Sequence, residues 1–175
     1  MQFNDQKKGM FMAFIAVMFI TPDSLFIRLA SVSSWNLIFY RGFIPFSLVF
    51  VGLLLIYKFK FINELISNGW HGVAYALIFT ITNITFVISI ENTNVANTLI
   101  MIALAPMLSA VLSFIFLKET PDKKTWLAII ITTLAVIYIF YDALDAEDLL
   151  GNALGLLTAL GLAVGAVIIR SKKKN

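Results

Sequence analysis

Six long apolar stretches, separated by short connections, dominate this sequence. Most of them are close to the ~20 residues that a helix needs to cross a hydrocarbon core about 30 Å thick. The fifth is the shortest, and we expect its helix to extend into Lys124 and Asp142. The pattern predicts an all-α integral membrane protein with about six transmembrane helices. The stretches are Gly9–Ala30, Trp35–Tyr57, Trp70–Ile90, Asn94–Leu117, Trp126–Tyr141 and Leu149–Ile169.

The composition agrees with this fold class. Hydrophobic residues make up 60% of the chain, whereas charged residues make up only 13%. An ordinary soluble domain is nearer half apolar and a quarter charged. Folded in water, this chain would have too few polar side chains to cover its core. We therefore expect a lipid bilayer to be its surroundings.

Basic residues fall mainly in alternate connections. If the N-terminus is cytoplasmic, eleven of the thirteen Lys and Arg residues lie on the cytoplasmic side. The connection after the fifth stretch carries four acidic residues and no basic one, and it then lies on the outer side of the membrane. By the positive-inside rule we expect a multi-pass protein of the cell (inner) membrane with both termini cytoplasmic. The cytoplasmic basic residues are Lys7, Lys8, Lys58, Lys60, Lys118, Lys123, Lys124, Arg170, Lys172, Lys173 and Lys174.

Several classes of function lack the residues that they need. Cysteine is absent, which excludes disulfides, thiolate metal sites and a cysteine nucleophile. His71 is the single histidine, whereas a metal site needs several ligands. There is no phosphate-binding glycine loop and no credible nucleophile–base set. Basic residues interleaved with aromatics, typical of nucleic-acid binding, are also missing. We expect no enzymatic activity, cofactor, metal or nucleic-acid partner.

Two opposite charges lie inside the first and second stretches. Asp23 lies seven residues before Ala30, and Arg41 lies six residues after Trp35. At 1.5 Å per residue, both are roughly 9–10 Å below the outer boundary, so they are well placed to meet. Charges at this depth are costly unless paired or hydrated. Two interpretations stay open: a solute site that opens outward, or an ion pair that only joins the two helices.

Other polar and helix-breaking residues extend this hypothesis. Pro22 precedes Asp23 and is expected to kink or break the first helix, as in transporters whose discontinuous helices form the binding site. Asn83 and Asn97 are placed either to line a cavity or to hydrogen-bond between helices, and the second role is the more common. Pro45 and Pro106 are further candidates for a helix kink or break.

The sixth stretch contains glycines four residues apart, at Gly151 and Gly155 and again at Gly161 and Gly165. Such glycines form a flat face on which another helix can approach closely, within this chain or in a second chain. The first stretch echoes the sixth, because Gly9 and Arg28 are spaced as Gly151 and Arg170 are. Five helices separate the two copies, so the second would cross the membrane in the opposite direction, as in inverted-repeat transporters.

The fourth stretch and its flanks resemble an EamA-type domain of the drug/metabolite transporter superfamily. The resemblance is carried by residues 91–100, by Leu-Ala-Pro at 104–106, by Phe-Leu-Lys-Glu at 116–119 and by Trp126. Phe-Tyr-Arg-Gly at 39–42 resembles the family's aromatic–Arg segment. Lys118 departs from the pattern, since the family commonly has glycine there.

The resemblance implies ten helices in two inverted five-helix halves around a central pocket. Residues 1–141 would form the first repeat, and 142–175 the outer loop and first helix of an incomplete second repeat. By position, Asp23, Arg41, Asn83 and Asn97 are expected to face the pocket and bind substrate.

The expected function is transport, by alternating access, of a small metabolite such as an amino acid or a nucleotide-related compound, in the direction of export. The expected partner is a homodimer mate or a missing second half. Two alternatives stay open: a truncated, inactive fragment of a ten-helix transporter, and a membrane subunit that does not transport.

Overall fold

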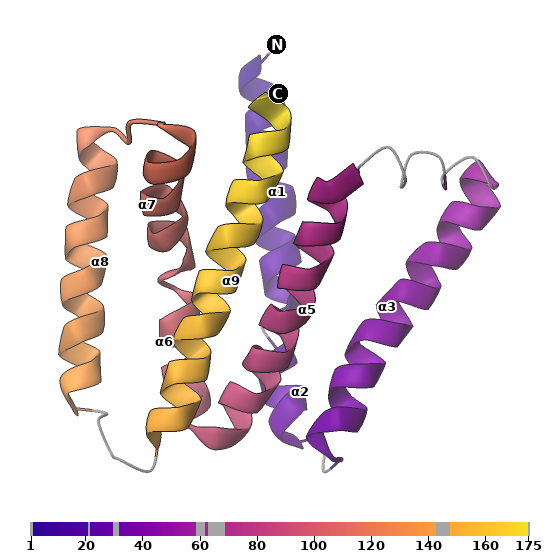
Figure 1. The fold of residues 1–175 in the computed structure, drawn as a ribbon, viewed down its shortest axis with the longest axis horizontal. Coiled ribbons are helices and arrows are strands. Elements are labelled where there is room, and N and C mark those ends of the chain that lie inside the picture. The colour runs from indigo at the N-terminus through magenta and orange to yellow at the C-terminus, as the bar shows by residue number, and fades with distance from the viewer. Residues whose placement is uncertain are drawn as a thin grey trace. The chain divides into compact units, whose positions relative to one another are not determined.

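The computed structural model describes residues 2–20, 22–29, 32–58, 62, 69–142 and 148–174. In these ranges the chain forms eight α-helices, labelled as in Figure 1. They fall into two compact units, Met1–Val32 and Ser33–Asn175, which are described separately. The helices are α1 Gln2–Ile20, α2 Asp23–Leu29, α3 Ser34–Tyr57, α5 Gly69–Asn92, α6 Val95–Ile102, α7 Ala105–Leu117, α8 Lys123–Asp142 and α9 Leu149–Lys174.

The first unit contains a helix that is interrupted at Pro22. Helix α1 ends at Ile20, and α2 begins at Asp23. Proline has no N–H to donate to the preceding turn, and its ring clashes with the carbonyl four residues earlier. The Pro22 carbonyl accepts a hydrogen bond from the Phe26 N–H at 3.0 Å, which starts the second helix. The predicted break is confirmed, although Thr21 itself lies outside the described residues.

The second unit contains the remaining helices, and their bounds follow the predicted stretches closely. The fifth stretch does extend to Lys124 and Asp142, within α8. The fourth stretch is divided into α6 and α7, with Pro106 in the first turn of α7. The break expected at Pro106 is therefore confirmed, whereas α3 continues through Pro45 without a break. The acidic connection falls mostly on residues 143–147, which lie outside the described part of the chain.

The described residues are helical throughout, which confirms the all-α fold class. Five segments are long and apolar enough to cross a membrane: Lys7–Ile27, Ser34–Tyr57, Gly69–Asn92, Val95–Leu117 and Leu149–Ser171. Helix α8, which contains the fifth predicted stretch, is not among them. No residue of α3 is buried, and large apolar side chains such as Leu48 and Leu55 are exposed along it. Such faces suit a lipid environment rather than water.

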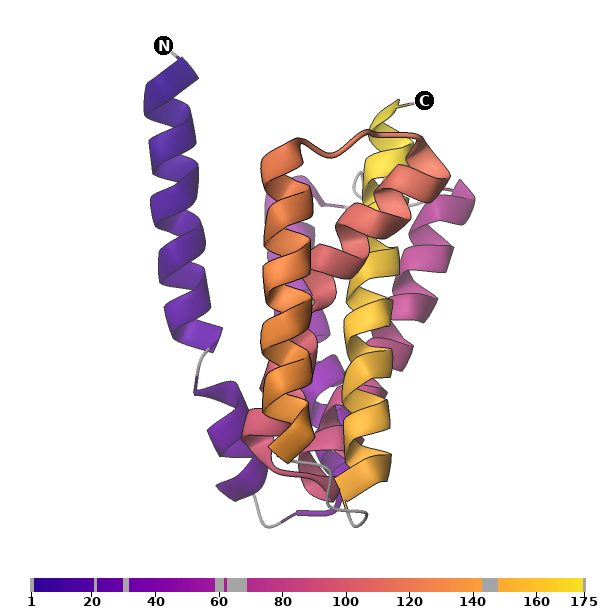
Figure 2. The ribbon, with the colours of Figure 1, turned by 90° about the vertical axis from the view of Figure 1, so that its left-hand side faces the viewer.

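Helix α9 packs against α5, α6 and α7 (Figure 1, Figure 2). Its glycines make this contact. A Cβ built on Gly151 would lie 2.5 Å from the Asn92 carbonyl oxygen, and one on Gly155 would lie 3.1 Å from Ser89 Oγ. The glycine face predicted from the sequence is thus used within the chain. Gly161 and Gly165 likewise meet Thr82 and Tyr75.

Buried hydroxyl and amide groups join α9 to its neighbours. The Thr85 and Thr158 hydroxyls are 2.8 Å apart, and Ser89 Oγ donates to the Gly151 carbonyl at 2.7 Å. Thr93 Oγ1 donates to Asn152 Oδ1 at 3.0 Å. Lipid tails are as apolar as leucine, so close packing and interhelical hydrogen bonds of this kind hold membrane helices together. We call this contact the α9 seam.

Lys118 ends α7 in the left-handed conformation, with φ 53° and ψ 31°. Its N–H hydrogen-bonds to the Ser113 carbonyl. A side chain costs about 1–2 kcal/mol in this conformation, and glycine avoids that cost. The conformation of Lys118 is therefore one that favours glycine, the residue that the resemblance leads us to expect at this position.

We expect Lys118→Gly to leave the stability unchanged or to raise it by up to ~1 kcal/mol, because relief of the strained backbone offsets the greater flexibility of glycine in the unfolded chain. The matched control is Lys124→Gly in the first turn of α8, where the backbone is helical and glycine should cost up to about 1 kcal/mol. Unfolding by denaturant in detergent micelles measures both. If Lys118→Gly loses as much stability as the control does, Lys118 does not have the left-handed conformation described.

Candidate functional site

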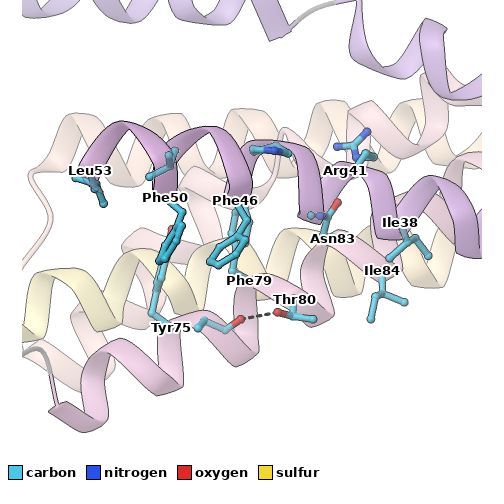
Figure 3. Close-up of a pocket in the computed structure, with 14 residues that line it drawn as sticks. Ile38, Arg41, Phe46, Phe50, Leu53, Tyr75, Phe79, Thr80, Asn83 and Ile84 are labelled. Atoms are coloured by element: carbon cyan, nitrogen blue, oxygen red, sulfur yellow. Dashed lines mark hydrogen bonds between the residues drawn. The ribbon is translucent and has the colours of Figure 1, made fainter. Parts of the chain in front are cut away.

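A cavity of about 870 Å³ lies between α3 and α5 (Figure 3). Its volume is within the usual range for a small-molecule site. Most of its wall is apolar, as such sites usually are, with a few polar groups that can fix the orientation of a ligand. The apolar wall includes Ile38, Pro45, Val49, Leu53 and Ile84.

The polar part of the wall contains Arg41 of α3 with Thr80 and Asn83 of α5. The Arg41 guanidinium carbon lies 5.3 Å from the centroid of the Phe86 ring, which is a cation–π geometry. Thr80 Oγ1 donates to the Ala76 carbonyl at 2.8 Å, so the lone pairs of its oxygen remain as an acceptor (Figure 3). Arg41 and Asn83 are both half-buried, which reduces the competition from water for their donors.

Aromatic side chains form two stacked pairs along the cavity. Phe46 and Phe50 of α3 have ring centroids 5.6 Å apart, and Tyr75 and Phe79 of α5 have centroids 6.0 Å apart. Each pair is spaced by one helical turn, so both rings lie on one face of their helix. All four rings line the cavity. The sequence reasoning missed them, although aromatic i,i+4 pairs on two successive apolar stretches were a signal that could have found them.

A hydrogen bond joins α3 to α5 at one end. Ser34 Oγ, at the start of α3, donates to the carboxylate of Glu91 near the end of α5. From there the two helices diverge toward Tyr57 and Gly69 (Figure 1). Ser34 lies seven residues before Arg41, or roughly 10 Å along the axis at 1.5 Å per residue. Glu91, for which we predicted no particular role, therefore joins α3 to α5 at the end of α3 that is nearer to Arg41.

The four predicted site residues are not in one place. Arg41 and Asn83 line the same cavity. Asn97 lies beside the α9 seam instead, where its Nδ2 is 3.4 Å from Thr93 Oγ1. Asp23 is the first residue of α2, in the other compact unit, and its pairing with Arg41 stays a prediction. Substrate binding by all four residues also stays a prediction.

The described part of the chain has no cluster of three or more His, Cys, Asp or Glu residues that could hold a metal ion. The polar side-chain groups of the cavity are instead the guanidinium of Arg41, the amide of Asn83 and the hydroxyls of Thr80 and Tyr75. Groups of these kinds can bind and orient a solute by hydrogen bonds and charge.

Comparison with known proteins gives one match. A model of the EamA-like transporter family matches residues 7–141, which is more than half of the chain. No curated protein and no solved structure matches. The matched range includes α3, α5 and the whole wall of the cavity. The chain therefore belongs to the EamA-like transporter family, a family of membrane transporters within the drug/metabolite transporter superfamily.

Proposed function

We propose that this chain transports a small organic metabolite across the membrane and binds it in the cavity between α3 and α5. The observation that supports this proposal most strongly is Arg41, a half-buried cation on a membrane-length helix that lines a solute-sized cavity. A charge within a membrane span is costly, so it commonly marks a substrate pathway. The family supports transport as the class of function, and the cavity supports the region between α3 and α5 as the binding site.

The finer parts of the proposal concern direction, membrane and partner. We propose export of an amino acid or a nucleotide-related compound from a cell whose inner membrane holds the chain, with both termini cytoplasmic. Alternating access needs two elements that move against each other around the site. We propose that a second copy or a second repeat supplies the other element and covers apolar side chains such as Phe39 and Phe43, which are exposed on α3.

Flux into vesicles tests the proposal. The purified chain is reconstituted into liposomes, and uptake of radiolabelled amino acids and nucleosides is compared with that of protein-free liposomes. We expect flux that falls by at least tenfold in Arg41→Ala, since a hydrogen bond to a charged group contributes about 1.5–3 kcal/mol. Asp23→Ala should also reduce flux if the two residues act together.

Two outcomes would contradict the proposal at different levels. Flux that persists unchanged in both variants would show that the site lies elsewhere in the protein. Absence of flux for every solute, with the helical content of the reconstituted chain intact by circular dichroism, would contradict transport itself.

A further inference from the structure

Tyr75 of α5 lies between two spaces. It lines the cavity between α3 and α5, and it also lines a smaller cavity of about 160 Å³ between α5 and α9. Phe79 lines both cavities as well, and its ring stacks on that of Tyr75 with 6.0 Å between the centroids. These two side chains therefore form a wall that faces α3 on one side and α9 on the other. A change on α9 can reach the proposed solute site through this wall.

Gly165, a buried residue of α9, contacts this wall from the side away from α3. A Cβ built on Gly165 would lie 3.3 Å from Cε2 and 3.6 Å from Cδ2 of the Tyr75 ring. The first distance is shorter than the optimal separation of about 3.5–4.0 Å between carbon atoms, so the ring would have to move. Because the added atom comes from α9, the direct way to relieve the contact is a shift of the ring toward α3. Glycine at this position thus leaves Tyr75 its room on the α9 side.

The register of α3 and α5 places Tyr75 opposite Phe50, toward the end where the two helices diverge. Ser34 bonds to Glu91 at the joined end, and Phe50 and Tyr75 each lie sixteen residues from that bond along their own helices. At 1.5 Å per residue this is roughly 24 Å. Thr80 lies only eleven residues from Glu91, so it is deeper in the cavity, and Figure 3 shows Tyr75 next to Phe50 with Thr80 farther along α5. A solute that comes in at the diverging end passes between Phe50 and Tyr75 first.

We propose that Gly165 is a positioning residue that acts through Tyr75 and sets the width of the cavity at its diverging end. With glycine behind it, the Tyr75 ring can lie against α9, and a ring-sized group such as a phenyl, an indole or a nucleobase passes between Tyr75 and Phe50. A side chain at position 165 moves the ring toward α3 and restricts the site to narrower solutes. This inference rests on the proposed function and gives its substrates a size limit.

Thiol labelling of the full chain in vesicles tests the inference without requiring transport. Thr80→Cys places a thiol in the cavity wall beyond Tyr75, and the chain has no other cysteine. The probes are benzyl methanethiosulfonate and the smaller methyl methanethiosulfonate, and the rate of each is compared between variants. Gly165→Ala should slow the benzyl reagent by about tenfold and the methyl reagent by less than about twofold, because only the larger group is crowded by the displaced ring.

Gly155→Ala is the matched control. It adds the same methyl group to the same helix, and the new Cβ would be about as crowded, at 3.1 Å from Ser89 Oγ, but neither Gly155 nor Ser89 lines the cavity. Both reagents should react in this variant as fast as in the parent protein. A second check uses Tyr75→Leu. In that background Gly165→Ala should no longer slow the benzyl reagent, because two residues that act through one contact are not additive and the ring is gone.

A benzyl rate that Gly165→Ala does not change would overturn the inference, because the ring would then have moved into the smaller cavity instead of toward α3. Equal slowing of both reagents, or slowing that persists without the Tyr75 ring, would also overturn it, since a general loss of packing would then be the cause. Failure of the proposed function looks different: the size effect on labelling is found, but reconstituted vesicles show no flux. Flux of wide and narrow solutes in a ratio that Gly165→Ala leaves unchanged would keep transport and remove only this inference.

Discussion

Gly42→Phe is expected to abolish solute flux without unfolding the protein. Gly42 lines the cavity, and a Cβ built there meets nothing within 4 Å. A phenylalanine at this position can therefore be accommodated, and its ring extends into the space that we assign to the solute. If the ring overlaps the solute, the loss should be on the order of tenfold or more, because each 1.4 kcal/mol of lost binding is tenfold in affinity.

Gly52→Phe is the matched control for this experiment. Gly52 lies on the same helix, and a Cβ there also meets nothing within 4 Å, but Gly52 does not line the cavity. The two variants add the same side chain to the same helix and differ only in the face that receives it. Uptake by reconstituted vesicles, normalised to the amount of inserted protein, measures both. Equal flux in the two variants would mean that the solute does not pass between α3 and α5.

Gly151→Ala is expected to weaken the α9 seam. The new Cβ would lie 2.5 Å from the backbone oxygen of Asn92 and 2.6 Å from Thr93 Cβ. A backbone atom cannot rotate away, so α9 must shift, and the hydrogen bond from Ser89 Oγ to the Gly151 carbonyl would be strained. Overpacking of this kind costs about 1–3 kcal/mol.

Denaturant unfolding in micelles, followed by circular dichroism, measures this loss. Gly52→Ala is the control, and it should be neutral or slightly stabilising, because the site is open and alanine is the better helix former. The stability of Gly155→Ala should lie between those of Gly151→Ala and Gly52→Ala. The nearest neighbours of its new Cβ, at 3.1–3.3 Å, are side-chain atoms that can adjust. If Gly151→Ala is as stable as Gly52→Ala, α9 does not pack against α5 as described.

The sequence predicts the helices well, because the length of an apolar stretch and the position of proline are local properties. Pro22 and Pro106 interrupt their helices wherever the rest of the chain lies. The choice of helix neighbours is different. Nearly every helix of a membrane protein has an apolar surface, so hydrophobicity does not show which faces meet. The glycines of α9 indicated a packing face, but only the structure shows that it packs against α5, α6 and α7.

Only part of the candidate site was predicted, because the sequence shows which residues are polar but not which helix faces meet. Arg41 and Asn83 could be found because polar groups in an apolar stretch are conspicuous. Asn97 looked equivalent to Asn83, yet the two differ in the direction of their side chains: one lines the cavity, and the other contacts Thr93. The aromatic wall could not be told from lipid-facing rings by composition. The bond between Ser34 and Glu91 joins residues far apart in sequence, which no local pattern predicts.

Cysteine labelling tests most directly whether the space between α3 and α5 is a hydrated solute site or a gap filled by lipid. The chain has no cysteine, so a single one can be introduced without removing others. Thr80→Cys places a thiol in the cavity wall. Leu48→Cys places one near the middle of α3 on a side chain that is 70% exposed and lies outside that wall.

The reagent is the anionic, water-soluble 2-sulfonatoethyl methanethiosulfonate, applied to the protein in vesicles. If the account is right, the thiol at position 80 reacts rapidly, whereas the thiol at position 48 stays unmodified because lipid surrounds it. If position 80 is as unreactive as position 48, the cavity holds lipid rather than water, and the central claim is wrong.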